Sequence, residues 1–305
     1  MDVFLYNGDL KRGQDLQFIE FISREKKSNE LMLVLVTPGG SPDAAYKIGR
    51  YIHSKYENFR VFVPGFCKSA GTLLAIAANE LVFSPYGELG PLDIQMAKVD
   101  NLAGLDSGLN ISEAFISLEN RAMMTFHQLI GDIIRSTGGI ASFNTASHSA
   151  AEILSSLYGP IFARIDPEEV GSRARAMRIG EDYGRRLNEK FGNLVPEGLS
   201  LLSQTYSSHG FVIDMEEAKA LFSRVRASSD AEKALVDEIG NVCRIPVSDG
   251  RLEIVNLSEV YHRHISQEEA DDTVDTQRDA TDGTPTSRRK AVKPNGEDTA
   301  GAGPA

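Results

Sequence analysis

The chain has 305 residues, 41% apolar and 25% charged, which is typical of a soluble globular protein with a sizeable core. Its 43 acidic and 32 basic residues give a net charge of −11, which argues against sequence-independent binding of DNA or RNA, since such binding relies on basic patches. Two cysteines, Cys67 and Cys243, are too few for a disulfide framework or a four-thiolate metal site.

The first 95 residues predict an alternation of strands and helices. Strands are expected at residues 3–6, 31–36, 60–64 and 81–84, and helices at residues 15–26, around residues 44–52 and at residues 69–79. The run at residues 31–36 is wholly apolar, which is typical of a strand buried on both faces. This alternation predicts an α/β fold with a parallel sheet and crossover helices.

The pattern becomes helical after residue 110. A long periodic segment at residues 111–135 ends at a pair of glycines, and another helix is expected at residues 196–206. Asp166, followed by a proline and two glutamates, predicts the start of a helix that runs to Phe191. Asp214 and Glu217 form a capping-box-like pair that predicts one more helix start.

The last forty residues, 266–305, differ in composition from the rest of the chain. They contain nine acidic residues but no leucine, isoleucine or aromatic residue. Because such a segment cannot bury enough apolar surface to offset its ordering entropy, it predicts a disordered acidic tail after a folded domain of residues 1–265. The chain has no long apolar run and no signal-peptide pattern at its start, so a cytoplasmic protein is expected.

Three loops that follow predicted strands contain residues suited to catalysis. Gly39 and Gly40 follow the second strand, where backbone N–H groups could form an oxyanion hole, although a plain strand-to-helix turn is the favoured interpretation of the pair taken alone. Ser69 stands where an apolar helix begins, as a nucleophile or simply as the helix cap. Asp93 follows a Gly/Pro-rich turn, as a catalytic carboxylate or a turn residue, and Glu88 is a weaker candidate from that loop.

Other nucleophiles and bases are available near Ser69. Cys67 is a second thinkable nucleophile, but a buried structural thiol is the simpler interpretation. Lys68 could act as the base of a Ser–Lys dyad, as could Lys98. Of the six histidines, His209 alone lies in a short glycine-flanked loop between two predicted helices. Neither metal-ligand spacing nor the dinucleotide-binding G-x-G-x-x-G occurs, so no metal and no cofactor are expected.

Taken in chain order, the motifs TPGG, KSAGT, GELGPLD and SHGFVID resemble the serine dehydrogenase proteinase family of the Clp-protease/crotonase-like superfamily. The resemblance spans roughly residues 3–245 and implies a spiral of ββα units with helical additions in the C-terminal half. It also implies an intracellular serine peptidase that acts through an acyl-enzyme. The implied catalytic residues are Ser69, Asp93 and His209, with backbone N–H groups near Gly39 or Gly40 and of Ala70 as the oxyanion hole.

Two other functions are compatible with the same fold. A crotonase-like enzyme would hold an acyl thioester in the glycine-built oxyanion hole, and a catalytically inactive scaffold would keep only the fold. As a peptidase, the chain is expected to act on a protein or peptide substrate and to form a homo-oligomer, with no nucleic-acid partner. Whether an unfoldase or a membrane protein is a further partner is left open by the sequence.

Overall fold

The computed structural model describes residues 1–92, 95–97, 105–164, 166–206, 208, 210–247 and 250–268. The chain divides into two compact units, Met1–His264 and Ile265–Ala305, and the sheet and the candidate site belong to the first. Among the helices described, none combines the length and the apolar character that a membrane span requires.

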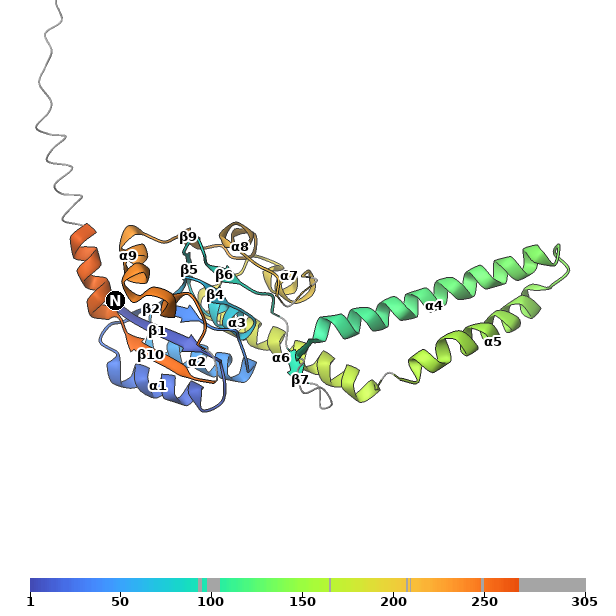
Figure 1. The fold of residues 1–305 in the computed structure, drawn as a ribbon, viewed down its shortest axis with the longest axis horizontal. Coiled ribbons are helices and arrows are strands. Elements are labelled where there is room, and N and C mark those ends of the chain that lie inside the picture. The colour runs from blue at the N-terminus through green and yellow to red at the C-terminus, as the bar shows by residue number, and fades with distance from the viewer. Residues whose placement is uncertain are drawn as a thin grey trace, which may run out of the picture. The chain divides into compact units, whose positions relative to one another are not determined.

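A six-stranded sheet forms the centre of the first unit, in the order β10-β1-β2-β3-β5-β9 (Figure 1). Its strands are β1 (Asp2–Gly8), β2 (Glu30–Val36), β3 (Asn58–Val63), β5 (Glu80–Phe83), β9 (Val225–Ala227) and β10 (Leu252–Asn256). All neighbours pair in parallel except β10, which runs antiparallel to β1. The predicted parallel α/β sheet is thus confirmed, while the two edge strands, β9 and β10, were not predicted.

The sheet is buried on both faces. Every residue of the apolar run at positions 31–36 of β2 is fully buried, as its composition predicts. One face packs against three helices, α1 (Gln14–Glu25), α2 (Pro42–Lys55) and α3 (Ala70–Ile76). Between β1 and α1, the rings of Tyr6 and Phe18 meet edge to face at 5.1 Å, so aromatic contacts fix this part of the core.

A second, smaller layer of strands follows the main sheet. After β3 the chain forms β4 (Phe66–Cys67), and after β5 it forms β6 (Glu88–Leu89), which pairs in parallel with β4. Single bridges extend this layer on both sides, from Thr37 to Cys67 and from Leu89 to Ile213. Each ββα repeat therefore contributes one strand to the main sheet and one short segment to the second layer, as a spiral of such repeats requires.

The C-terminal half is mainly helical, as predicted. Its helices are α4 (Gly108–Ser136), α5 (Phe143–Phe162), α6 (Pro167–Phe191), α7 (Gly198–Gln204), α8 (Met215–Leu221) and α9 (Asp230–Ile239), with a 3₁₀ turn η1 (Gly240–Cys243). Residues 258–268 form a further helix. A short antiparallel pair, β7 (Gln95–Ala97) and β8 (Leu105–Ser107), precedes α4. Helices α4 and α5 pack side by side (Figure 1).

The two predicted helix starts are both capped. The Asp166 carboxylate accepts the Glu168 N–H at 2.8 Å, and the Asp214 carboxylate accepts the Glu217 N–H at 2.9 Å. The Glu217 side chain accepts a hydrogen bond from the Tyr206 hydroxyl at 2.8 Å. The carboxylate of Glu217 thereby links α8 to the end of α7.

Residues beyond 268 are expected to contribute nothing to folding or chemistry, because their composition cannot form a core. The part of the predicted tail that the structure describes, residues 266–268, is helical. A chain ending at residue 268 should keep the thermal midpoint of the full chain within about 1 °C. Differential scanning calorimetry of both chains measures this, and a fall of several degrees would show that the tail stabilises the folded domain.

Candidate active site

Ser69 lies between β4 and α3, where the chain turns from the second layer into an apolar helix. It occupies the N-cap position of α3, yet its side chain makes no capping hydrogen bond. The residue is 7% exposed, so its hydroxyl is sheltered but not sealed from solvent. A purely structural cap does not account for this serine, which favours the catalytic interpretation.

The backbone of Ser69 is strained. Its φ of 52° and ψ of −111° lie outside the regions that side chains with a Cβ normally occupy. Among the described residues other than glycine, only Ser69 and Glu197 have a positive φ. Such conformations cost about 1–3 kcal/mol and cluster at active sites, where a sharp strand-to-helix turn presents a nucleophile.

The glycine loop after β2 lies directly against Ser69. Two backbone hydrogen bonds of 2.9 Å join the two segments, from Thr37 N–H to Phe66 O and from Lys68 N–H to Thr37 O. A Cβ added at Gly39 would come within 2.8 Å of the Ser69 Cβ and 3.3 Å of the Ala70 nitrogen. The close contact between the glycine loop and Ser69 thus requires glycine at position 39. The φ of +105° at this position also favours glycine.

The backbone donors of the predicted oxyanion hole differ in their engagement. The Gly39 N–H donates to Thr37 Oγ1 at 3.0 Å, an interaction that the sequence analysis missed although a threonine before a Pro-Gly-Gly turn is a signal for it. Within the described residues, neither the Gly40 N–H nor the Ala70 N–H donates to a protein acceptor. Of the three predicted donors, Gly40 and Ala70 are therefore the two without a protein acceptor among the described residues, and their role in an oxyanion hole stays a prediction.

Two more loops reach the same region. Leu89 and Ile213 exchange backbone hydrogen bonds of 2.9 and 3.0 Å, which brings the segment before α8 to the second layer of strands. The Thr72 hydroxyl of α3 donates to Gly90 O at 2.6 Å, and the Leu92 N–H donates to Leu202 O at 2.9 Å. The segment before Asp93 is thereby bonded to α3 and to Leu202 of α7, and the segment after His209 is bonded to β6.

The side chains of both predicted partners lie outside the described residues. Asp93 directly follows Leu92, which is buried, and His209 lies two positions before Phe211. Lys98, the alternative base, also lies outside them. The assignment of Asp93 and His209 therefore stays a prediction, supported by the placement of their neighbours.

The alternative residues beside Ser69 are each engaged elsewhere. Cys67 is fully buried and burial raises the pKa of its thiol, so it is the structural thiol that its setting suggested. The Lys68 amine donates to the carbonyl oxygens of Leu89 and Phe211, both at 3.0 Å. Glu88 forms an ion pair with that amine at 3.3 Å.

The described histidines have structural surroundings. The His53 ring bonds to Ala77 O at 2.7 Å, and burial lowers the pKa of this histidine. His264 pairs with Glu238, and His262 bonds to the Met1 carbonyl. His148 is exposed within α5 and lies 3.8 Å from the Glu152 carboxylate.

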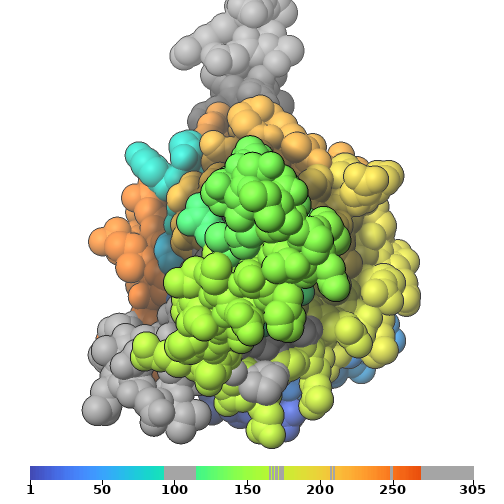
Figure 2. Space-filling view, turned by 90° about the vertical axis from the view of Figure 1, so that its right-hand side faces the viewer, coloured from blue at the N-terminus to red at the C-terminus, as the bar shows by residue number. Residues whose placement is uncertain are grey.

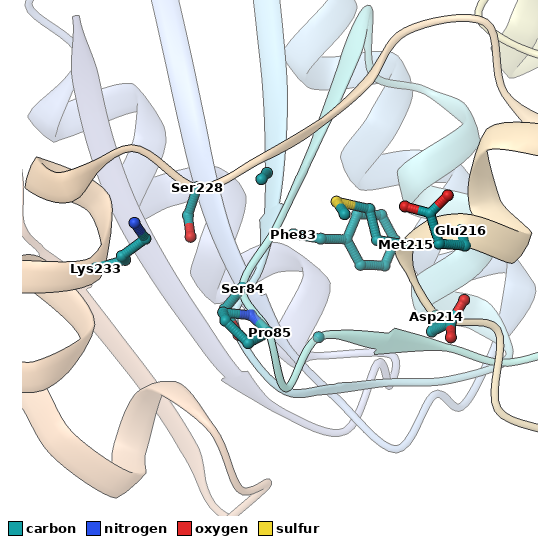
Figure 3. A pocket seen from close by; sticks show the side chains of 10 residues that line it. Phe83, Ser84, Pro85, Asp214, Met215, Glu216, Ser228 and Lys233 are labelled. Carbon is teal, nitrogen blue, oxygen red and sulfur yellow. The ribbon is translucent and has the colours of Figure 1, made fainter.

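A cavity of about 350 Å³ opens beside the second layer of strands. Figure 3 shows Phe83, Ser84 and Pro85 at its centre, with Met215 and two carboxylates on one side and Ser228 and Lys233 on the other. The residues that line it are Phe83, Ser84, Pro85, Gly87, Asp214, Met215, Glu216, Ala227, Ser228 and Lys233. Ser69 and the glycine loop do not line it, so the candidate active site is built on other contacts.

Residues 16–107, which include the glycine loop and Ser69, match the model of the ClpP-like SDH-type serine proteinases. This segment, less than a third of the chain, is therefore similar to that family. The matched segment contains the motifs TPGG, KSAGT and GELGPLD, so it confirms the resemblance that they indicated, and with the observed sheet it confirms the fold class. His209 lies beyond the matched segment.

An uncharacterized protein of Methanocaldococcus jannaschii is 32% identical over 82 residues, which are 27% of this chain and 29% of that protein. The chain thus matches less than a third of the length of this relative. Two solved structures of variants of the 1510-N membrane-bound stomatin-specific protease are also similar. One has 16% identity and a TM-score of 0.29, covering 47% of this chain and 65% of the other. The second, in complex with a substrate peptide, has 20% identity and a TM-score of 0.30, covering 42% and 58%.

Proposed function

We propose that the chain is a serine peptidase that cleaves peptide bonds through an acyl-enzyme. Ser69 Oγ attacks the scissile carbonyl carbon, and His209 accepts the hydroxyl proton and later delivers it to the leaving amine. Asp93 orients the histidine. The N–H groups of Gly40 and Ala70 bind the oxyanion, and water then hydrolyses the ester to release the second product.

The strained backbone of Ser69, pressed against Gly39, carries this proposal. A serine that merely capped α3 would need neither a positive φ nor a glycine whose missing Cβ makes room for it. The two N–H groups of Gly40 and Ala70, one from each segment, are available for an oxyanion. The match to the family model supports the same chemistry, because the matched residues include the glycine loop, Ser69 and Ala70.

Substrate class tests the proposal directly. The purified chain should react with a fluorophosphonate, in which Ser69 Oγ bonds to phosphorus and fluoride leaves, and should hydrolyse peptide esters. A crotonase-like enzyme would instead bind or turn over an acyl-CoA thioester, and an inactive scaffold would do neither. A folded protein that resists fluorophosphonate labelling would contradict the peptidase assignment.

The triad predicts large losses in the labelling rate of Ser69 when either partner is replaced. His209→Ala should lower the labelling rate of Ser69 by at least about 10³-fold, because the serine loses its base. Asp93→Asn should cost about 10³- to 10⁴-fold, since the histidine loses its orientation and its favoured tautomer. His127→Ala is the control, because His127 is exposed on α4 and should leave the rate unchanged. Labelling time courses followed by intact-protein mass spectrometry measure all three rates.

A Ser–Lys dyad is the rival to this triad. If Lys98→Ala abolished labelling while His209→Ala left it intact, the lysine would be the base and the triad would be wrong. Comparing the two variants separates the mechanisms, because both keep Ser69 and its glycine loop.

Self-association through α4 and α5 is a second expectation. Large apolar side chains are exposed along these helices, among them Met124 at 64% and Leu157 at 58%. Figure 2 shows the surface of the two helices in green, facing the viewer. Exposed apolar groups of this size mark contact surfaces, so a second copy of the chain is the expected partner.

Light scattering should therefore give a mass well above the 33.3 kDa of one chain at micromolar concentration. The double variant Met124→Glu/Leu157→Glu should dissociate the assembly, because it introduces carboxylates into the contact. Leu16→Glu, at an exposed apolar residue of α1, is the matched control and should not change the mass. A wild-type protein that remains a monomer would refute self-association.

A further inference from the structure

Lys68 directly precedes the candidate nucleophile in the chain, and its amine is buried in the protein. The residue is 3% exposed, and lysine is seldom buried this deeply without partners. Its Nζ lies 3.0 Å from both Leu89 O and Phe211 O, and 3.3 Å from the Glu88 carboxylate. These three oxygens match the three N–H donors of an ammonium group.

The two carbonyl groups belong to the two loops that lead to the predicted partners of Ser69. Leu89 lies four positions before Asp93, and Phe211 lies two positions after His209. The two loops meet through the paired hydrogen bonds of Leu89 and Ile213. The Lys68 side chain, which belongs to the same segment as Ser69, thus binds both loops.

The surroundings of Lys68 are shaped to its side chain. A Cβ added at Gly90 would come within 2.7 Å of Lys68 Cδ, so the methylene chain fills the space that this glycine leaves. The ammonium also lies 5.4 Å from the centre of the Phe66 ring, within range of a cation–π contact. Because its methylene chain and its ammonium group both have close contacts, Lys68 is suited to hold the two loops in place rather than to accept a proton from Ser69.

We propose that Lys68 is a positioning residue of the peptidase, whose buried ammonium ties the loops bearing Asp93 and His209 to the segment bearing Ser69. The inference rests on the proposed function for its catalytic consequence. Lysine is required because an apolar side chain of the same length could fill the space but could not bind two carbonyl oxygens.

Lys68→Met is the direct test, with Lys47→Met, a half-exposed lysine of α2, as the control. Lys68→Met should lower the fluorophosphonate labelling rate of folded protein by about 10- to 100-fold, as expected when catalytic groups shift by about 1 Å. In a His209→Ala background the same change should have less than about a threefold effect, because the positioned histidine is gone. The proposal would be overturned if Lys68→Met left the labelling rate of the otherwise wild-type protein unchanged. It would also be overturned if Lys68→Met lowered the rate as much in the His209→Ala background as it does in the wild type.

Two further measurements keep the inference falsifiable. If Lys68→Met does not fold, Gly90→Ala is the substitute, because its added Cβ shifts the methylene chain of Lys68 while the charge is kept. Gly90→Ala should slow labelling at least threefold, and an unchanged rate would overturn the proposal. If the wild type is not labelled at all, the proposed function fails. Hydrogen exchange then tests the structural role of Lys68 by itself. In a folded Lys68 variant, the Leu89 and Ile213 amides should lose about tenfold of their protection, whereas the amides of β2 should keep theirs. Unchanged protection at Leu89 and Ile213 would show that Lys68 does not hold the two loops.

Discussion

Replacing Ser69 with alanine is expected to abolish fluorophosphonate labelling and to lower peptidase turnover by about 10⁴- to 10⁶-fold, because the attacking oxygen is lost. The fold should persist, since the Ser69 side chain makes no capping hydrogen bond to α3. Mass spectrometry of the labelled protein and turnover of a peptide ester measure the two losses. The thermal midpoint should stay within about 2 °C of the wild type.

Ser41→Ala is the matched control for this prediction. Ser41 occupies the corresponding N-cap position of α2, also without a side-chain capping bond, and it should be dispensable for labelling. Ser69→Gly offers an independent check on strain. Glycine tolerates a positive φ, so this inactive variant should be more stable than Ser69→Ala by about 1 kcal/mol in chemical unfolding. Equal labelling of wild type and Ser69→Ala would exclude Ser69 as the nucleophile.

The sheet could be predicted from sequence where its signals are local. The strand β2 and the helix starts at Asp166 and Asp214 could be predicted because residues that are neighbours in the sequence determine them. The edge strand β10 was missed because it pairs with β1, at the opposite end of the domain, and its alternation is weak. The three-residue β9 has no periodic signal at all and is ordered by its pairing with β5.

The site could be predicted in part for the same reason. Ser69 is recognisable from its place before an apolar helix with small residues, but its positive φ depends on contacts with the glycine loop. The role of Lys68 could not be predicted, because the amine binds Phe211, 143 residues further along the chain. No local pattern encodes that contact, and only the spiral arrangement of the short strands creates it.

Gly39→Ala is expected to slow the labelling of Ser69 strongly, although the nucleophile itself is kept. The added Cβ would lie 2.8 Å from the Ser69 Cβ and 2.9 Å from Lys68 O, so the serine segment must move away from the glycine loop. A displacement of this kind separates Ser69 and the Ala70 donor from the Gly40 donor, and the labelling rate should fall by about 100-fold or more.

Backbone strain alone must be separated from this contact. Gly13→Ala provides the comparison, because Gly13 has a φ of +95°, close to that of Gly39, but no atom lies within 4 Å of the position its Cβ would take. Both variants should lose about 1–2 kcal/mol of stability from the positive φ, while only Gly39→Ala should lose labelling. Chemical unfolding and labelling rates on the same samples measure both quantities. If the two variants label alike, the close approach of Gly39 to Ser69 has no catalytic role, and the oxyanion hole must be formed elsewhere.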